Sequence, residues 1–306
     1  MRILVVGGTL FIGKLLVDVM RQAGHEVLIL HRNAHGGPQE LVADRNSPEE
    51  VWRALAGQRF DVVFDNVYDW QRGTTAEQVL ATAQAAQPRH RYVFMSSVGA
   101  YVEGLNRVES DPLAYDGPGE YARNKARSER SLFDSGLPVV TLRPPYVYGP
   151  GDPFYREAFF WDRLRDGRPI LIPGDGQRLM QMVYVGDIVR ACVAAIEKPV
   201  AGQSFNVAHP QPMTQVDLVR AFAEVAGVDP QLVFVPRERL EGVQGLYFGE
   251  LYDLPPITQV TTKIEQQLGV TATNFHEALR VTYEDYLRQP RRPVDYSLED
   301  SLLLRA

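Results

Sequence analysis

The feature that most constrains this chain is the alternation of two hydrophobic periods along its first two-thirds. Short apolar, β-branched runs predict buried strands at Ile3–Val6, Val27–Leu30, Glu40–Ala43, Asp61–Phe64, Tyr92–Met95 and Val139–Arg143. Amphipathic stretches between them predict helices at Phe11–Ala23, Pro48–Ala56 and Thr74–Gln87. Strands that each return through a helix pair in parallel with right-handed crossovers. We therefore expect an α/β fold with a doubly wound parallel sheet.

The pattern changes after about residue 150. Glycine, proline and aromatic residues crowd 149–173, and the later pattern predicts a helix at Asp187–Lys198 with Asp187 as N-cap, a strand at Phe205–Ala208 and a helix at Gln215–Ala226. We expect a sheet domain over residues 1–150, which also takes in about 183–210. A smaller, interleaved C-terminal substrate domain would then comprise 151–182 and 211–306.

Composition narrows the classes of partner. A net charge of −6 and a pI near 5.6 argue against a nucleic-acid or anionic membrane surface, both of which need a basic face. The single cysteine, Cys192, excludes an intramolecular disulfide and is expected to pack in the core. No apolar run approaches the roughly 20 residues of a membrane span, and a first strand at the very start leaves no room for a signal peptide. We expect a cytoplasmic protein with a small-molecule substrate.

A glycine turn links the first strand to the first helix. It reads Val6-Gly-Gly-Thr-Leu-Phe-Ile-Gly13. Glycines in this place permit positive φ and a close approach of the backbone, so that the helix N-terminus can receive a pyrophosphate. The alternative is a tight turn that serves packing alone. With a strand before it and a helix after it, the turn predicts dinucleotide binding.

Tyr121 and Lys125 stand four residues apart in a predicted helix, so their side chains share one face. A free phenol has a pKa near about 10 and is a poor base at neutral pH. A positive charge about 4 Å away, at an effective dielectric of about 20, would lower that pKa by roughly three units. The pair therefore suits proton transfer. The alternative is a packed ring beside a solvated lysine.

These segments together resemble a known family. The glycine turn, Val93-Phe-Met-Ser-Ser-Val-Gly-Ala-Tyr101, the Tyr121/Lys125 pair and Arg143-Pro-Pro-Tyr-Val-Tyr-Gly149 are similar to motifs of the extended short-chain dehydrogenases/reductases, the NAD-dependent epimerase/dehydratase family, over roughly residues 2–210. The resemblance implies a Rossmann fold and an NAD(P)-dependent oxidoreductase or epimerase that acts on a secondary alcohol or ketone, sugar-like substrates included. It also implies a homodimer through helices 74–87 and 119–135.

The resemblance also implies roles for individual residues. Ser97 would hydrogen-bond the reacting oxygen, Tyr121 would be the general acid/base, and Lys125 would hold the nicotinamide ribose. Lys125 and the positive nicotinamide ring would together lower the Tyr121 pKa. The implied cofactor site comprises Gly7, Thr9, Leu10, Phe11, Ile12, Gly13, Arg32, Asp44, Val67, Tyr68, Ser96, Lys125, Pro144 and Val147. One of these departs from the family pattern, because Leu10 occupies the place of the middle glycine.

The end of the second strand bears on the choice of cofactor. A carboxylate there would bind the ribose hydroxyls and repel a 2′-phosphate, but Leu30-His-Arg-Asn33 contains none. Arg32 is able to pair with that phosphate. NADP is therefore favoured over NAD. The alternative is that Arg32 is a solvated loop residue.

Three further departures concern the substrate. Val98 and Gly99 stand where dehydratase members carry an acidic pair. Tyr146 replaces the asparagine of nucleotide-sugar epimerases, and Met180 stands where they place a pyrophosphate-binding arginine, with Arg178 two residues away. Because a methionine cannot pair with phosphate, we expect UDP-sugars to bind weakly or not at all. Tyr146, Arg178 and Met180 are the expected substrate residues.

The departures also suggest a branch of the family. Together with Asp65-Asn-Val-Tyr-Asp69 and residues 294–300, they are similar to the atypical branch that includes the chloroplast stem-loop RNA-binding proteins and their bacterial relatives. The alternative function is therefore a non-catalytic dinucleotide-sensing or RNA-binding protein on the same fold. We expect no metal site, since Gly36-Gly-Pro38 disfavours a helix that would align His31 with His35.

Overall fold

The computed structural model describes residues 1–33, 37, 39–243, 246 and 255–304. Seven parallel strands form one sheet in the order β12-β7-β5-β4-β1-β2-β3. Their bounds are β1 Arg2–Val6, β2 Glu26–His31, β3 Glu40–Val42, β4 Val62–Asp65, β5 Arg91–Met95, β7 Val139–Arg143 and β12 Gln203–Asn206. Each strand overlaps a predicted one, and the doubly wound parallel sheet is confirmed.

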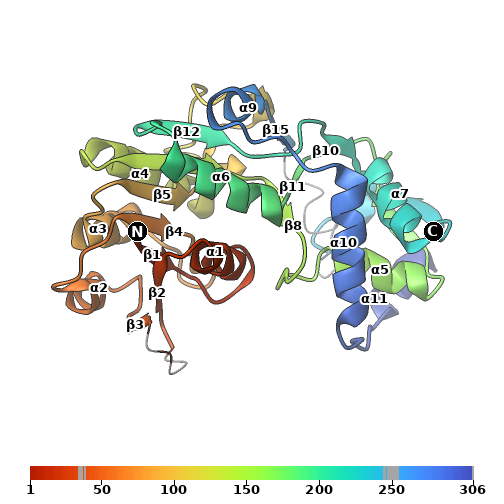
Figure 1. Ribbon diagram of the computed structural model, residues 1–306. Helices are drawn as coiled ribbons and strands as arrows, with labels where there is room; N and C mark the ends of the chain where they lie inside the picture. Colours follow the sequence, from red (N-terminus) through yellow and green to blue (C-terminus); the bar gives the residue numbers. More distant parts are fainter. Residues whose placement is uncertain (34–36, 38, 244–245, 247–254, 305–306) are drawn as a thin grey trace.

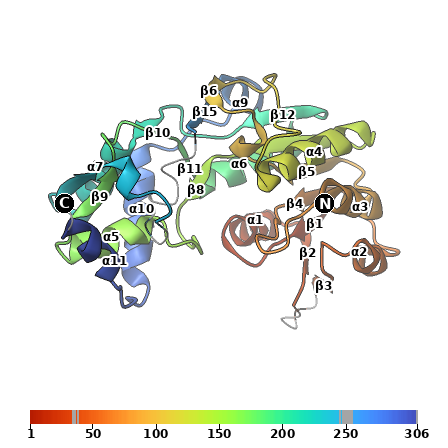
Figure 2. The ribbon, with the colours of Figure 1, turned by 180° about the vertical axis from the view of Figure 1, so that it is seen from behind.

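Helices cover both faces of the sheet (Figures 1 and 2). One face carries α1 (Phe11–Gln22) and α6 (Val185–Glu197), and the other carries α2 (Pro48–Leu55), α3 (Ala76–Ala86) and α4 (Glu120–Asp134). Local signals fix some of these starts. Ser47 caps α2 ahead of Pro48, and Thr75 and Gln78 form a capping box at α3. The predicted cap of α6 is wrong: the helix begins at Val185, and the Asp187 carboxylate instead accepts hydrogen bonds from Thr273.

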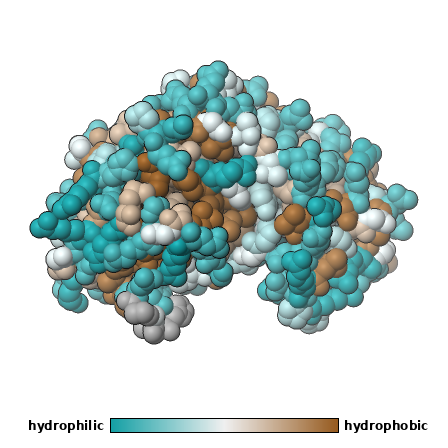
Figure 3. Space-filling view, in the orientation of Figure 1, coloured by the Kyte–Doolittle hydropathy of each residue, from teal (hydrophilic) through white to brown (hydrophobic). Residues whose placement is uncertain are grey.

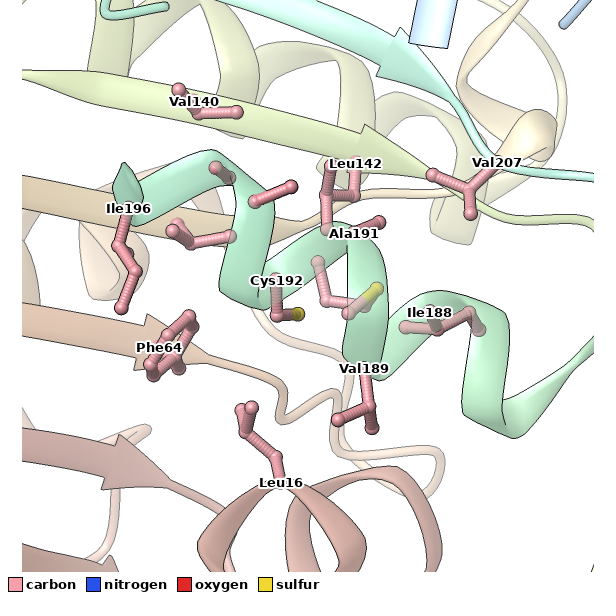
Figure 4. Close-up of a cluster of buried hydrophobic side chains, with 14 of the residues drawn as sticks. Leu16, Phe64, Val140, Leu142, Ile188, Val189, Ala191, Cys192, Ile196 and Val207 are labelled. Atoms are coloured by element: carbon pink, nitrogen blue, oxygen red, sulfur yellow. The ribbon is translucent and has the colours of Figure 1, made fainter. Parts of the chain in front are cut away.

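The core between α1, α6 and the sheet is continuous and apolar. Figure 4 shows Cys192 of α6 among side chains of the sheet and of α1, including Leu16 and Phe64. Cys192 is 1% exposed, as the apolar side of its helix predicts. Full burial of such side chains stabilises a fold by about 1.5–3 kcal/mol each, which fixes the sheet as a rigid base for whatever lies at its edge.

The C-terminal part has a separate core. Its elements are α5 (Glu157–Arg165), β9 (Ile170–Pro173), α7 (Gln215–Ala226), β14 (Leu232–Val235), η2 (Arg237–Arg239), α10 (Phe275–Arg288) and α11 (Ser297–Leu303). Trp161 and Phe222 pack edge to face at its centre, with ring centroids 5.7 Å apart. Parallel pairing of β9 with β14 adds a small second sheet.

Short strand pairs and one helix join the two parts. They are η1 (Val98–Ala100), β6 (Gly104–Arg107) with β15 (Ile257–Gln259), β8 (Tyr146–Tyr148) with β11 (Met182–Tyr184), β10 (Leu179–Met180) with β13 (Met213–Thr214), and α9 (Thr262–Leu268). Residues 257–270 were assigned to the C-terminal domain by the sequence pattern, yet they lie against the sheet. Ile264 and Leu268, one helical turn apart, pack into the same core as α6. Among the described residues, no helix is long and apolar enough to cross a membrane.

Candidate active site

A cavity of about 1830 Å³ lies at the carboxyl ends of the sheet strands, between the sheet and the C-terminal part. Figure 3 shows the surface hollowed between the two parts, with apolar side chains gathered in the hollow. The chain changes direction across the sheet here, since β1 is flanked by β2 on one side and β4 on the other. Such a switch point is where doubly wound sheets bind ligands. The volume exceeds the roughly 300–1,000 Å³ of a single small-molecule site, so it suits a cofactor together with a substrate.

The predicted site residues converge on this one cavity. Those that line it are Gly7, Thr9, Leu10, Phe11, Ile12, Arg32, Asp44, Val67, Tyr68, Ser96, Ser97, Tyr121, Lys125, Pro144, Tyr146, Val147, Arg178 and Met180. The exception is Gly13, which lies beneath the turn. A Cβ atom on Gly13 would fall 1.9 Å from the carbonyl oxygen of Gly7, so this glycine permits the close packing of helix on turn.

The backbone of the glycine turn accounts for Leu10. Gly7 has φ +85°, which favours glycine, whereas Leu10 has φ −134° and ψ 150°, an extended conformation open to any residue. The Leu10 side chain is 65% exposed, and Phe11 takes the left-handed conformation at φ +44°. The missing middle glycine is therefore no obstacle. The first amides of α1 lack partners within the helix and offer a site for phosphate.

Lys125 lies deep in the site, on the face of α4 that it shares with Tyr121. Its Nζ donates to the carbonyl oxygen of Met95 at 2.6 Å and lies 4.8 Å from the centre of the Phe94 ring. Burial lowers the pKa of Lys125 to about 8, although the Asp65 carboxylate acts in the opposite direction. The ammonium is therefore still largely charged at neutral pH, with little surrounding water.

The pKa of Tyr121 is raised in the ligand-free protein. Burial raises its pKa to about 12, a hydrogen bond with the Ser97 side chain opposes this, and nearby Tyr68 adds to it. Lys125 alone does not lower the Tyr121 pKa in the ligand-free protein, because Nζ lies 5.8 Å from the centre of the Tyr121 ring and is bound to Met95. The lowering predicted for Lys125 together with a bound nicotinamide stays a prediction. Tyr121 therefore holds its proton at neutral pH and is ready to act as an acid.

Two serines stand at the end of β5, beside Tyr121. The Oγ of Ser97 accepts a hydrogen bond from the Gly99 amide at 3.1 Å, which leaves its own proton available for donation. The Oγ of Ser96 is buried and has no hydrogen-bond partner among residues 1–33, 37, 39–243, 246 and 255–304. An unpaired buried hydroxyl beside the predicted cofactor residues fits a site that a polar ligand completes.

An aromatic cluster around Tyr121 was missed by sequence reasoning. The Trp70 indole stacks on the Tyr121 ring, with centroids 4.8 Å apart and planes 23° apart. The Tyr68 ring meets Tyr121 edge to face at 4.7 Å. Aromatic residues directly after β4 were the available signal, but nothing in their spacing to Tyr121 indicates contact across 51 residues.

Ion pairs also line the cavity, at Arg32, Asp44 and Asp69. Arg32 donates to the Asp69 carboxylate at 3.1 Å, and Arg72 bridges Asp69 and Asp44, each at 2.7 Å. Burial alone would raise the pKa of Asp69, but hydrogen bonds from Arg72 outweigh it and the pKa is lowered. Sequence reasoning identified Arg32 and Asp44 here but missed Asp69 and Arg72.

The predicted substrate residues lie at the end bounded by the C-terminal part. Met180 is 7% exposed, and Arg178 and Gln215 line the cavity beside it. Burial raises the pKa of the Tyr146 phenol, while the charges of Arg156 and Arg178 act against that rise. Arg156 is not indicated by the sequence. His35 lies outside the described residues, and the His31 ring lies 3.4 Å from Glu40.

Comparison with known proteins gives a consistent result. The model of the NAD dependent epimerase/dehydratase family matches residues 3–208. The chain is 29% identical over 260 residues to the chloroplast stem-loop binding protein of 41 kDa b of Arabidopsis thaliana, which covers 78% of this chain and 67% of that protein. It is 28% identical over 275 residues to the 2-alkyl-3-oxoalkanoate reductase of Stenotrophomonas maltophilia, covering 79% and 82%.

The structural comparison extends further along the chain. The crystal structure of a UDP-glucose 4-epimerase complex with NAD from Thermus thermophilus matches with a TM-score of 0.72 and 25% identity. This match covers 95% of the chain and 100% of that protein. It therefore includes the C-terminal part, beyond the residues that the family model matches.

Proposed function

The chain belongs to the NAD-dependent epimerase/dehydratase family, and from that premise we propose that it is an NAD(P)-dependent oxidoreductase that interconverts a ketone and a secondary alcohol. The observation that carries the proposal is the convergence of Ser97, Tyr121 and Lys125 on one cavity with the glycine turn. These side chains come from β5 and α4, which are far apart in sequence. A cavity that held only a nucleotide would not also need a partly buried phenol beside a buried hydroxyl and a buried ammonium.

Tyr121 is the proton donor in this proposal. When bound, the nicotinamide supplies the hydride that reduces the substrate carbon. Tyr121, with a pKa of about 12 in the free protein, is protonated at neutral pH and gives its proton to the substrate oxygen. The Oγ of Ser97 accepts from the Gly99 amide and donates its own proton to the same substrate oxygen. Lys125 contributes a buried positive charge that stabilises the phenolate left behind.

The first βα turn and the ion-pair end would hold the cofactor. Gly7, Thr9 and the N-terminus of α1 would receive the pyrophosphate, and Arg32 would pair with the 2′-phosphate of NADP, which we favour over NAD. Arg32 is now bound to Asp69, but Arg72 also neutralises that carboxylate. Arg32 is thus able to turn to a phosphate without leaving Asp69 unpaired. The structurally similar Thermus thermophilus epimerase, by contrast, was crystallised in complex with NAD.

The substrate end argues against a nucleotide sugar. The buried Met180 offers a thioether where a pyrophosphate needs a cation. Weak or absent binding of UDP-glucose in calorimetry is therefore the expected result. Micromolar affinity would favour an epimerase instead.

RNA binding is a second candidate, because the Arabidopsis thaliana relative is named for binding a stem-loop. The net charge of −6 weighs against it, since phosphate contacts need a basic surface. Filter binding to a structured RNA tests it directly. An affinity that falls steeply with added salt would support this candidate.

The decisive experiment for the oxidoreductase is Tyr121→Phe. It removes the proton donor and leaves the ring that packs against Trp70. Oxidation of NADPH with a panel of ketones should fall by about a thousandfold or more, while the Kd for NADPH, measured by calorimetry, stays within about twofold. Tyr283→Phe in α10 is the matched control, because it removes a phenol hydroxyl that does not line the cavity and keeps the ring that stacks on Tyr286. Unchanged turnover in Tyr121→Phe would exclude this mechanism.

A further inference from the structure

We propose that Trp70 determines substrate specificity by stacking on a planar, apolar group of the substrate, so that the preferred substrate is an aryl-bearing ketone or alcohol. The inference rests on the proposed function, because it concerns the substrate of the same site. Trp70 lines the cavity and touches the ring of the proposed acid, Tyr121. In this proposal Trp70 binds the substrate and takes no part in the chemical step.

The exposure of Trp70 is the first argument. One face of its indole is covered by Tyr121, yet the residue remains 64% exposed inside a cavity. Each buried square ångström of apolar surface is worth about 25 cal/mol, and stacked aromatic pairs gain more through their geometry. The uncovered face of the indole is therefore a ready platform for a flat, apolar group.

Other apolar side chains of the same cavity supply the second argument. Val102, Phe154 and Tyr155 also line the cavity, and they are 45%, 48% and 37% exposed. They come from segments distant from Trp70 in the sequence, so local composition does not explain their meeting in one hollow. Exposed apolar side chains that gather in a cavity mark a binding surface for an apolar ligand.

One charged group that lines the cavity, Arg156, is already engaged. Arg156 pairs with Asp152 at 3.1 Å, and its guanidinium lies 4.7 Å from the centre of the Phe154 ring. A substrate that replaced those contacts would have to compete with them. An apolar ring can be bound without breaking the pair.

The loop that carries Trp70 is held in place by Asp69. The Asp69 carboxylate accepts hydrogen bonds from the backbone amides of Gln71 at 2.9 Å and Arg72 at 3.0 Å, and its own amide donates to Thr74 at 3.0 Å. Asp69 itself is 8% exposed. The platform is thus positioned before any ligand arrives, which reduces the entropy lost on binding.

The stacking geometry also indicates the shape of the substrate. Because Tyr121 covers the inner face of the indole, a substrate ring on the outer face lies one indole away from the phenol. A short chain must therefore separate that ring from the reacting carbonyl. A suitable probe is 4-phenylbutan-2-one, and its matched partner is decan-2-one, which has as many carbons but no ring.

The test measures binding of both ketones by calorimetry in the presence of NADP⁺, so that neither ketone is reduced. The wild-type protein should bind 4-phenylbutan-2-one about tenfold more tightly than decan-2-one. Trp70→Leu should raise the Kd for the aryl ketone about tenfold and the Kd for the aliphatic ketone by less than about threefold. Trp70→Phe keeps a flat ring and should retain most of the preference. The matched control is Trp52→Leu on α2, which is 47% exposed and should change neither affinity.

Equal losses for both ketones in Trp70→Leu, or no loss for either, would overturn the proposal. Failure of the proposed function gives a different result: no ketone oxidises NADPH, although binding that depends on Trp70 persists. If Trp70→Leu fails to fold, tryptophan fluorescence supplies the comparison: the aryl ketone should quench it in the wild-type protein and not in Trp70→Phe, which lacks this indole. Absence of quenching in the wild-type protein would also count against the platform.

Discussion

The two ends of the cavity are built from different materials. The proposed cofactor region consists of backbone geometry at Gly7 and partly exposed ion pairs that involve Arg32 and Arg72. The proposed catalytic region consists of aromatic rings and buried polar groups, with the pKa of Lys125 lowered to about 8 and that of Tyr121 raised to about 12. Exposed pairs contribute little to stability and exchange readily with a ligand, whereas buried groups hold their unusual properties only through desolvation.

The largest expected effect is at the glycine turn, where the packing around Gly13 leaves no space for a side chain. Gly13→Ala places a Cβ atom 1.9 Å from the Gly7 carbonyl oxygen, so the turn must move. We expect the free energy of unfolding to fall by about 3 kcal/mol and NADP⁺ binding to be lost, as measured by urea unfolding and calorimetry. Gly24→Ala, just after α1, is the control: at φ +79° it strains the backbone by about 1–2 kcal/mol, but its added atom meets nothing within 4 Å, so NADP⁺ binding should be kept. Unchanged binding in Gly13→Ala would show that the turn does not form the phosphate site.

A smaller effect is expected at the catalytic end. The Lys125 pKa is about 8 in the folded protein against an ordinary 10.5, so between these values the unfolded chain binds more protons and stability rises with pH. Between pH 7 and 9.5 the wild-type protein should gain about 2 kcal/mol relative to Lys125→Met.

Urea unfolding of both proteins at the two pH values measures this difference. Lys198→Met, at an exposed lysine, should show no such dependence. If the gap between wild type and Lys125→Met does not change with pH, the lysine is not desolvated, and the contrast between the two ends disappears.

The smallest effect concerns the exposed ion pairs. Arg32→Ala should raise the Kd for NADP⁺ about tenfold and the Kd for NAD⁺ by less than about twofold in calorimetry, because only NADP⁺ carries the 2′-phosphate. Stability should change little, since the Arg32 side chain is 57% exposed and Arg72 still pairs with Asp69. Arg53→Ala, at an exposed arginine of α2, is the control. Equal weakening of both cofactors would remove the basis for preferring NADP.

Local patterns were sufficient for much of this architecture. Strand and helix periods predicted the parallel sheet, and the glycine turn followed by a helix indicated where a dinucleotide would bind. The motifs around Ser97 and Tyr121 resemble family patterns closely enough to predict that both residues share one site. Both residues line the same cavity. Each of these signals lies within a few residues of chain, where spacing alone fixes which side chains share a face or a turn.

The sequence by itself therefore predicted the sheet and the turn, and it singled out Tyr121 and Lys125 as the candidate acid and ammonium. Only the tertiary structure decided how those groups behave. In the ligand-free structure, Lys125 donates its hydrogen bond to the Met95 carbonyl oxygen and burial raises the pKa of Tyr121. The Trp70 indole stacks on the Tyr121 ring. These outcomes depend on burial and on distances between segments far apart in the chain, and desolvation of a charge or a ring has no local signature in the sequence.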